Sequence, residues 1–381
     1  MARHTLTFGG AAVRMLHTLR TLPTVRLCLL AACAAIPFGC STYPVDTTGR
    51  DLLELESVWQ YLRAYSIWQD SVPLPPNAFT YALPETLLAH VNDTLHGHSY
   101  TGYTDALPGP SRSGFASQGV AGAQPASDSA PPIYYGAVTP RTAFLQIVTF
   151  DNDYLLDSFL VALPFLSRYA NIMLDLRGDG GGSIALMDSI IEYFLPVNTP
   201  FIVATYRAYS GASRTASTVH GERWTTKHAH SPTLDGKNIV ILLNRGSASA
   251  SEMLAAGIKD GRASAGLSPC LFVGDTSYGK GIGQVLINRA WLSKRDLSIT
   301  YLRVVRACGC PDSVYHRKGL APDVRVTNAN EAVADSLQFL AALHVLEPGV
   351  LPKEIPVNRS RSNGLPTSVD YIIQSISDFE K

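Results

Sequence analysis

Residues 246–252 read Gly-Ser-Ala-Ser-Ala-Ser-Glu, and they join two segments with different hydrophobic patterns. The run before them, 239–243, is apolar at every position, which predicts a strand that is buried on both faces. The run after them, 253–258, is apolar at near-helical spacing. The sequence therefore predicts a strand-to-helix corner, where a serine hydroxyl is exposed and backbone N–H groups face a bound group. A serine-rich helix start, with a serine as its N-cap, is the alternative interpretation.

Two glycine-rich stretches also follow short apolar runs. Residues 175–182 read DLRGDGGG and lead into a helical apolar pattern, whereas residues 274–281 read GDTSYGKG. The first stretch offers free backbone N–H donors of the kind that stabilise an oxyanion. The second places one lysine between glycines, where neighbouring backbone can approach closely and the amine can be buried.

Together the three stretches resemble the C-terminal processing (tail-specific) serine proteases. Members of that family share a D-L-R-x-N-x-G-G turn, an S-A-S-A-S-E corner and a G-x-x-x-x-G-K-G loop, in this order. The first motif here has Asp179 where the family usually has asparagine, and residues 319–323 resemble the family's closing G-[I/V]-x-P-D. The resemblance covers residues 141–326, about half of the chain, and implies a Ser–Lys catalytic dyad without a cofactor.

The resemblance implies Ser249 as the nucleophile and Lys280 as its general base. A serine hydroxyl is a weak nucleophile and needs a base within hydrogen-bond reach. A lysine can act as that base only when its amine is neutral, and full burial lowers a lysine pKa by up to about 3–5 units. The spacing between the two residues exceeds the family's usual value by a few residues, which we assign to a loop insertion within 262–269.

Four further groups complete the predicted site. Glu252 and Gln284 resemble the family's supporting polar residues, with capping or helix-surface polarity as the alternative interpretation. The oxyanion donors are expected to be the backbone N–H of Ala250 and one from Gly181 or Gly182.

The N-terminal 40 residues are predicted to be a lipoprotein-type signal segment. Basic residues precede an apolar run at 27–40 that is too short to span a bilayer but suits a signal peptide. The run ends at Cys40, which we favour as the lipidated residue over Cys33. A plain cleaved signal or an uncleaved anchor remains the alternative.

The remaining chain divides by composition and periodicity. Residues 41–104 are predicted to be a small helical region, with a second helix that starts at Pro84. Residues 105–140, rich in Pro, Gly and Ser, are predicted to be a linker. Strands and helices alternate through the core at 141–327, which favours an α/β fold, and residues 328–381 form a helical tail. The family resemblance implies the fold of Clp protease and crotonases. The glycine-rich loop of a PDZ domain is not recognised, which weakens the case for tail-specific recognition.

Histidines and cysteines offer two candidate metal sites, neither of which we favour. Paired histidines at 96 and 98, and at 228 and 230, lack clustered acids nearby in sequence and are interpreted as solvated turn residues. Cys270, Cys308 and Cys310 could bind zinc with His316, but one disulfide is favoured in an exported protein. No metal ion is therefore expected from the sequence.

Other function classes fit less well. Net charge is zero and charged residues make up 16% of the chain, so no nucleic-acid partner is expected. A nucleotide-binding P-loop would need Ser or Thr at Gly281. An S-x-x-K enzyme using Ser277 would need a helix through Lys280, and acyl-CoA chemistry would not need the Ser–Lys pair.

The sequence therefore predicts an exported serine endopeptidase of the cell envelope, anchored to the membrane by lipid and acting on protein or peptide substrates. Its oligomeric state is left open. The alternative is a non-catalytic surface lipoprotein that uses the same fold as a binding module.

Overall fold

The protein is a mixed α/β structure, which confirms the predicted fold class. The computed structural model describes residues 50–68, 72, 81, 83–91, 101–104, 131–209, 217–287, 296–328 and 330–350. The predicted signal segment, with Cys33 and Cys40, and most of the predicted linker lie outside these residues. In the part of the chain that is described, no helix combines the length and the apolar character needed to cross a membrane.

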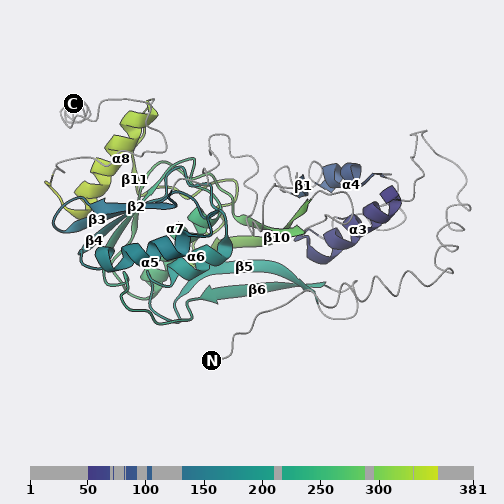
Figure 1. Cartoon of the computed structure of the whole chain (residues 1–381), viewed down its shortest axis with the longest axis horizontal. Helices are drawn as coiled ribbons and strands as arrows, with labels where there is room; N and C mark the ends of the chain where they lie inside the picture. Colours follow the sequence, from purple (N-terminus) through teal and green to yellow (C-terminus); the bar gives the residue numbers. More distant parts are fainter. Residues whose placement is uncertain are drawn as a thin grey trace, which may run out of the picture. The chain divides into compact units, whose positions relative to one another are not determined.

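A six-stranded sheet forms the centre of the predicted core region (Figure 1). Its strands, in order across the sheet, are β11 (Val324–Arg325), β8 (Leu271–Gly274), β7 (Asn238–Leu243), β4 (Asn171–Asp175), β3 (Thr142–Ile147) and β2 (Ile133–Ala137). All neighbours are parallel except β2, which runs antiparallel to β3. Continuous apolar runs suit these strands because parallel sheets are covered on both faces.

Helices cover the two faces of this sheet. On one side lie α5 (Leu155–Leu166), α6 (Ile184–Ile191) and α7 (Ala250–Ser264), and on the other lies α8 (Glu331–Leu346). Within β7, Ile239 and Ile241 belong to the first core, whereas Val240 and Leu242 belong to the second. This alternation is the two-residue period of a strand.

A second, antiparallel sheet packs against the same group of helices. It contains β1 (Gly102–Thr104), β10 (Asp296–Arg306), β5 (Pro200–Tyr209) and β6 (Ser217–Thr225), with β9 (Ile282–Ile287) also paired to β10. Helix α7 contacts α6, β5 and β10, so its surroundings are protein on nearly every side.

The N-terminal helices form a separate small core with this second sheet. Helix α3 (Arg50–Tyr65) and helix α4 (Pro84–His90) contribute Leu55 and Leu87, which pack with Ile299 of β10. The helix predicted from Pro84 does begin there, as expected for proline in a first turn.

Three boundaries differ from the sequence-based expectation. Strand β2 lies inside the range 105–140 that was expected to be a linker, because the Pro- and Ser-rich composition before it masked a short β-prone segment. Strand β1 lies inside the region expected to be helical. Helix α8, expected in a C-terminal tail, packs on the central sheet and begins after Asn330, whose side chain accepts the N–H groups of Ala332 and Val333.

Candidate active site

The predicted turn and the predicted serine corner meet at one edge of the central sheet. Strands β4 and β7 are parallel neighbours, so their carboxyl ends open on the same side. The side-chain oxygen of Asn244 accepts the N–H groups of Gly178 (3.0 Å) and Gly246 (2.9 Å). The hydroxyl of Ser247 donates to the carbonyl of Leu176 at 2.8 Å. These bonds lock the two loops together.

The backbone of Asp179 supports the serine corner directly. Its carbonyl accepts the N–H of Ala248 at 2.9 Å and the hydroxyl of Ser251 at 3.0 Å. The two donors flank Ser249 in sequence, so the carbonyl fixes the chain on both sides of that residue.

Ser249 has the strained backbone that a nucleophile at a strand-to-helix corner adopts. It is the N-cap residue of α7, with φ 58° and ψ −117°, and it is 9% exposed. A positive φ in a residue other than glycine costs on the order of 1–3 kcal/mol and concentrates at functional sites. The same strand–turn–helix geometry exposes the nucleophile of α/β-hydrolases.

Glu252 connects the serine corner to the lysine loop. Its Oε2 accepts the N–H groups of Ser249 (3.0 Å) and Lys280 (2.7 Å). Its Oε1 accepts the N–H of Gly279 (2.7 Å) and the hydroxyl of Ser277 (2.5 Å). The side chain is fully buried, and burial raises the pKa of its carboxyl although all four hydrogen bonds oppose that shift. Glu252 therefore caps helix α7 and also holds the backbone of the lysine loop. It thus agrees with both interpretations made from the sequence, a supporting polar residue of the site and a capping residue.

Lys280 is buried in the way that a lysine base requires. It is 5% exposed, and burial lowers its pKa to about 8, against the opposing charge of Glu252. The preceding Gly279 has φ +92°, and a β-carbon there would lie 2.7 Å from the N atom of Gly319. The closing motif that contains Gly319 thus packs against the lysine loop, which leaves no room for a side chain at residue 279.

Ser277 has a structural position that excludes the S-x-x-K interpretation. Its hydroxyl donates to Glu252 and accepts the N–H of Leu320 at 2.7 Å. Residues 276–281 are not helical, so the i and i+3 geometry that the S-x-x-K motif needs is absent from this described segment.

The glycine turn lies directly against the serine. A β-carbon on Gly181 would lie 2.8 Å from Cβ of Ser249 and 2.9 Å from the N atom of Ala250. The N–H of Gly181 donates to Oδ1 of Asp179 at 2.9 Å. Among the described residues, the N–H groups of Gly182 and Ala250 have no hydrogen-bond acceptor. Of the two glycines that the sequence left open, Gly182 is therefore the one whose N–H is available.

Gln284 lies on β9, four residues after Lys280. It is buried, and its Nε2 lies 3.4 Å from the hydroxyl oxygen of Thr300 on β10. The structure thus gives this residue a partner across two strands rather than a helix-surface position.

The side chain of Asp179 differs from the asparagine that the family resemblance implies. It is fully buried, and its Oδ2 has no hydrogen-bond partner among the described residues. Burial raises the pKa of the carboxyl from 3.8 to about 8, against the hydrogen bond from the N–H of Gly181. At neutral pH this side chain is therefore mostly a neutral acid, which has nearly the same shape as asparagine.

The structure corrects the interpretation of one histidine pair. His228 and His230 were expected to lack nearby acids, but their ring nitrogens lie 2.7 Å and 3.0 Å from Oε2 of Glu192. Glu192 is distant in sequence, so no local pattern could have indicated the contact. The other pair, His96 and His98, lies outside the described residues.

The cysteines of the described residues form one disulfide, as favoured from the sequence. Cys308 pairs with Cys310, and Cys270 is buried with a free thiol. A zinc site that uses both of the paired cysteines with His316 is excluded by that bond.

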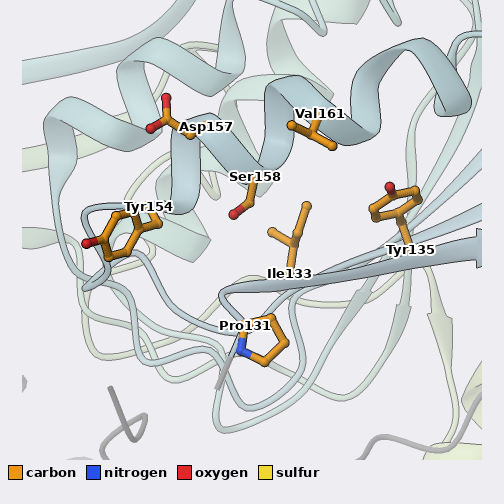
Figure 2. A pocket seen from close by; sticks show the side chains of 7 residues that line it. All are labelled: Pro131, Ile133, Tyr135, Tyr154, Asp157, Ser158 and Val161. Carbon is orange, nitrogen blue, oxygen red and sulfur yellow. The ribbon is translucent and has the colours of Figure 1, made fainter. Parts of the chain in front are cut away.

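A separate open hollow lies at the β2 edge of the central sheet (Figure 2). Ser158 and Val161 of α5 border it opposite Ile133 and Tyr135 of β2. Neither Ser249 nor Lys280 lines it, so it is not the site of the predicted chemistry.

Comparisons with known proteins match about half of the chain. A model of peptidase family S41 matches residues 141–326. The carboxy-terminal processing protease CtpB of Bacillus subtilis is 27% identical over 204 residues, which cover 53% of this chain and 37% of that protein. The carboxyl-terminal-processing protease of Synechocystis is 26% identical over 183 residues, which cover 47% of this chain and 37% of that protein. The matched region thus spans little more than a third of each relative.

A solved structure shares the fold. An S41 protease structure from Bacteroides fragilis superposes with a TM-score of 0.50 at 14% identity and covers 82% of this chain and 100% of that chain. At this identity the similarity concerns the architecture alone.

Proposed function

The chain carries a peptidase family S41 domain, and on that premise we propose that it is an exported serine endopeptidase with a Ser249–Lys280 dyad. The observation that carries the proposal is the position of Glu252. One buried carboxylate accepts the backbone N–H of both residues, which ties the nucleophile and the base to a single anchor. The strained φ of Ser249 and the lowered pKa of Lys280 support the same assignment.

In the first step, the neutral amine of Lys280 accepts the hydroxyl proton of Ser249, and Oγ attacks the carbonyl carbon of the scissile peptide bond. Negative charge then develops on the carbonyl oxygen. The available N–H groups of Ala250 and Gly182 are the proposed donors to that oxygen, and each such donor typically contributes about 10²–10³ in rate.

In the second step, protonated Lys280 donates its proton to the leaving amine, which releases the first product and leaves an acyl-enzyme on Ser249. Water, deprotonated by Lys280, then hydrolyses the ester and restores the hydroxyl. Burial keeps the lysine pKa near neutrality, so that one side chain can act as base and then as acid.

The substrates are proposed to be proteins or peptides, in keeping with the family. Tail-specific recognition is not part of the proposal, because no PDZ-type loop is recognised in the sequence. The signal segment predicted for the N-terminal 40 residues supports export, and Cys40 is the proposed attachment point for a lipid anchor in the cell envelope.

The alternative of a non-catalytic binding module is less well supported. Such a module would gain nothing from a buried lysine whose amine is readily neutral. It would gain equally little from a serine held at a positive φ next to available N–H donors.

Cleavage of a denatured protein by Ser249→Ala tests the proposal. The variant should lose activity by about 10⁴-fold or more while it keeps the wild-type circular dichroism spectrum and Tm. Ser277→Ala is the matched control, because it also removes a buried hydroxyl next to Glu252 but leaves the nucleophile in place. It should reduce stability and retain measurable cleavage. Wild-type cleavage by Ser249→Ala would refute the assignment of the nucleophile.

A further inference from the structure

We propose that Glu192, His228 and His230 form a binding site for a divalent transition metal ion, with zinc as the ion that best suits these donors. The three residues each offer one ligand atom, and these atoms all lie within 4.8 Å of one another. Nitrogen from imidazole and oxygen from a carboxylate is a donor set that zinc takes with three protein ligands and one open position. Magnesium and calcium prefer oxygen ligands alone, so they fit this site less well.

The geometry requires a movement of side chains to accept the ion. Oε2 of Glu192 lies 2.7 Å from Nδ1 of His228 and 3.0 Å from Nε2 of His230. Zinc bonds of about 2.0–2.1 Å in a tetrahedron separate neighbouring ligand atoms by about 3.3 Å. Oε2 of Glu192 therefore needs to separate from each ring nitrogen by a few tenths of an ångström, and the two ring nitrogens, which lie within 4.8 Å of each other, need to reach the same tetrahedral spacing. His228 can make this movement, because its side chain is 69% exposed.

Two neighbouring groups orient the ligands. The second oxygen of Glu192, Oε1, accepts the N–H of Lys227 at 2.9 Å, which leaves Oε2 directed at the histidines. The ring of His230 stacks on the ring of Tyr193, with the centroids 4.1 Å apart. Support of this kind for ligand orientation is typical of metal sites.

A simpler interpretation is that both histidines only hydrogen-bond to Glu192. In those hydrogen bonds each ring nitrogen donates its N–H to Oε2 of Glu192, whereas a metal ion binds the lone pair of the same nitrogen after that proton has left. The two interpretations therefore predict different results only when metal is added. Burial favours the metal, because Glu192 is 6% exposed and a buried carboxylate gains more from a cation than an exposed one.

Water can fill the open position, as in zinc sites that have three protein ligands. Asp188, four positions before Glu192, is not among the residues whose ligand atoms lie within 4.8 Å of one another, and its carboxylate lies 3.8 Å from Nζ of Lys227.

Bound metal would connect two segments of the fold. Glu192 is the C-cap residue of α6, and the two histidines belong to the loop after β6 (Ser217–Thr225). Helix α6 begins immediately after the glycine turn that contains Gly182. The ion would therefore hold this loop against the far end of the helix that leads away from the proposed active site.

Isothermal titration of tag-free, EDTA-treated protein with zinc chloride tests the proposal, with differential scanning fluorimetry as the second measurement. Wild-type protein should bind one equivalent with a Kd below about 10 μM, and its Tm should rise with zinc but not with magnesium. His228→Ala should lower the affinity by tenfold or more. This variant should fold, because it removes an exposed ring.

His344→Ala is the matched control, since it removes an exposed histidine from α8, and it should bind zinc like the wild type. His230→Ala should repeat the loss seen for His228→Ala. Two outcomes would overturn the proposal. One is the absence of zinc binding by folded wild-type protein, and the other is equal binding by His228→Ala, His230→Ala and wild type.

Discussion

Replacing Asp179 with asparagine should stabilise the protein, and the gain should increase as the pH rises. The wild-type carboxyl is fully buried, and its Oδ2 has no hydrogen-bond partner among the described residues. Burial raises its pKa from 3.8 to about 8. Asparagine has nearly the same shape and can accept the N–H of Gly181 in the same way, but it does not titrate.

The magnitude follows from proton linkage. The unfolded chain releases the Asp179 proton near pH 4, whereas the folded chain keeps it up to about pH 8. Across this window the folded state binds one more proton, so its stability falls by about 1.4 kcal/mol for each pH unit. The contribution of the bound Asp179 proton to the stability of the folded state is fully present below pH 4 and is lost as the pH rises to about 8. At pH 7 the loss amounts to about 4 kcal/mol, and it levels off above pH 8 at roughly 5–6 kcal/mol.

Urea unfolding of both proteins at pH 5, 6, 7, 8 and 9, followed by tryptophan fluorescence, measures this difference. The free energy of unfolding of Asp179→Asn minus that of wild type should rise by about 1.4 kcal/mol per unit from pH 5 to 7, then flatten. Asp153→Asn, at an exposed position, is the control and should stay within about 0.5 kcal/mol of wild type. A difference that does not change with pH would show that Asp179 is already ionised in the folded protein.

Three further predictions concern the proposed dyad, the proposed lipid anchor and the recognition of substrate termini. Because the pKa of Lys280 is lowered to about 8, kcat/KM should rise as the pH increases toward that value. Lys280→Arg should be inactive because guanidinium stays protonated. An active arginine variant would exclude the dyad. Metabolic labelling with a fatty acid should be lost in Cys40→Ala and retained in Cys33→Ala, whereas the reverse pattern would move the lipidated residue to Cys33. Matched free-acid and amidated peptides should be cleaved with similar kcat/KM. A tenfold preference for the free acid, or about 1.4 kcal/mol, would instead reveal a carboxylate-binding site.

The hydrophobic pattern predicted most of the central sheet and its helices. The apolar run that precedes the serine corner is β7, and the helical pattern after it is α7. Strand β2 was assigned to a linker because a five-residue strand next to Pro- and Ser-rich sequence has too short a pattern to stand out. The weak alternation of β6 and the two-residue length of β11 give no hydrophobic pattern from which either strand could be predicted.

Motif spacing predicted the residues of the candidate site but not their physical state. Sequence alone could not indicate the positive φ of Ser249, which depends on the corner that the loops impose, or the pairing of Gly181 with Asp179. The contact between Glu192 and the two histidines joins segments that are distant in the chain. Only the fold brings them together, so no local pattern could have predicted it.

The four hydrogen bonds that Glu252 accepts also determine how the proposed site would lose its activity. Ser249 lies at the start of α7 and Lys280 in the loop after β8, yet the backbone of each is held by the same carboxylate oxygen. A fluctuation that withdraws this oxygen releases both residues at once, so the two segments form one cooperative unit of local unfolding. A population of molecules under mild heat or denaturant would therefore contain fully competent and fully disabled sites, and very few in which the serine had lost only its base.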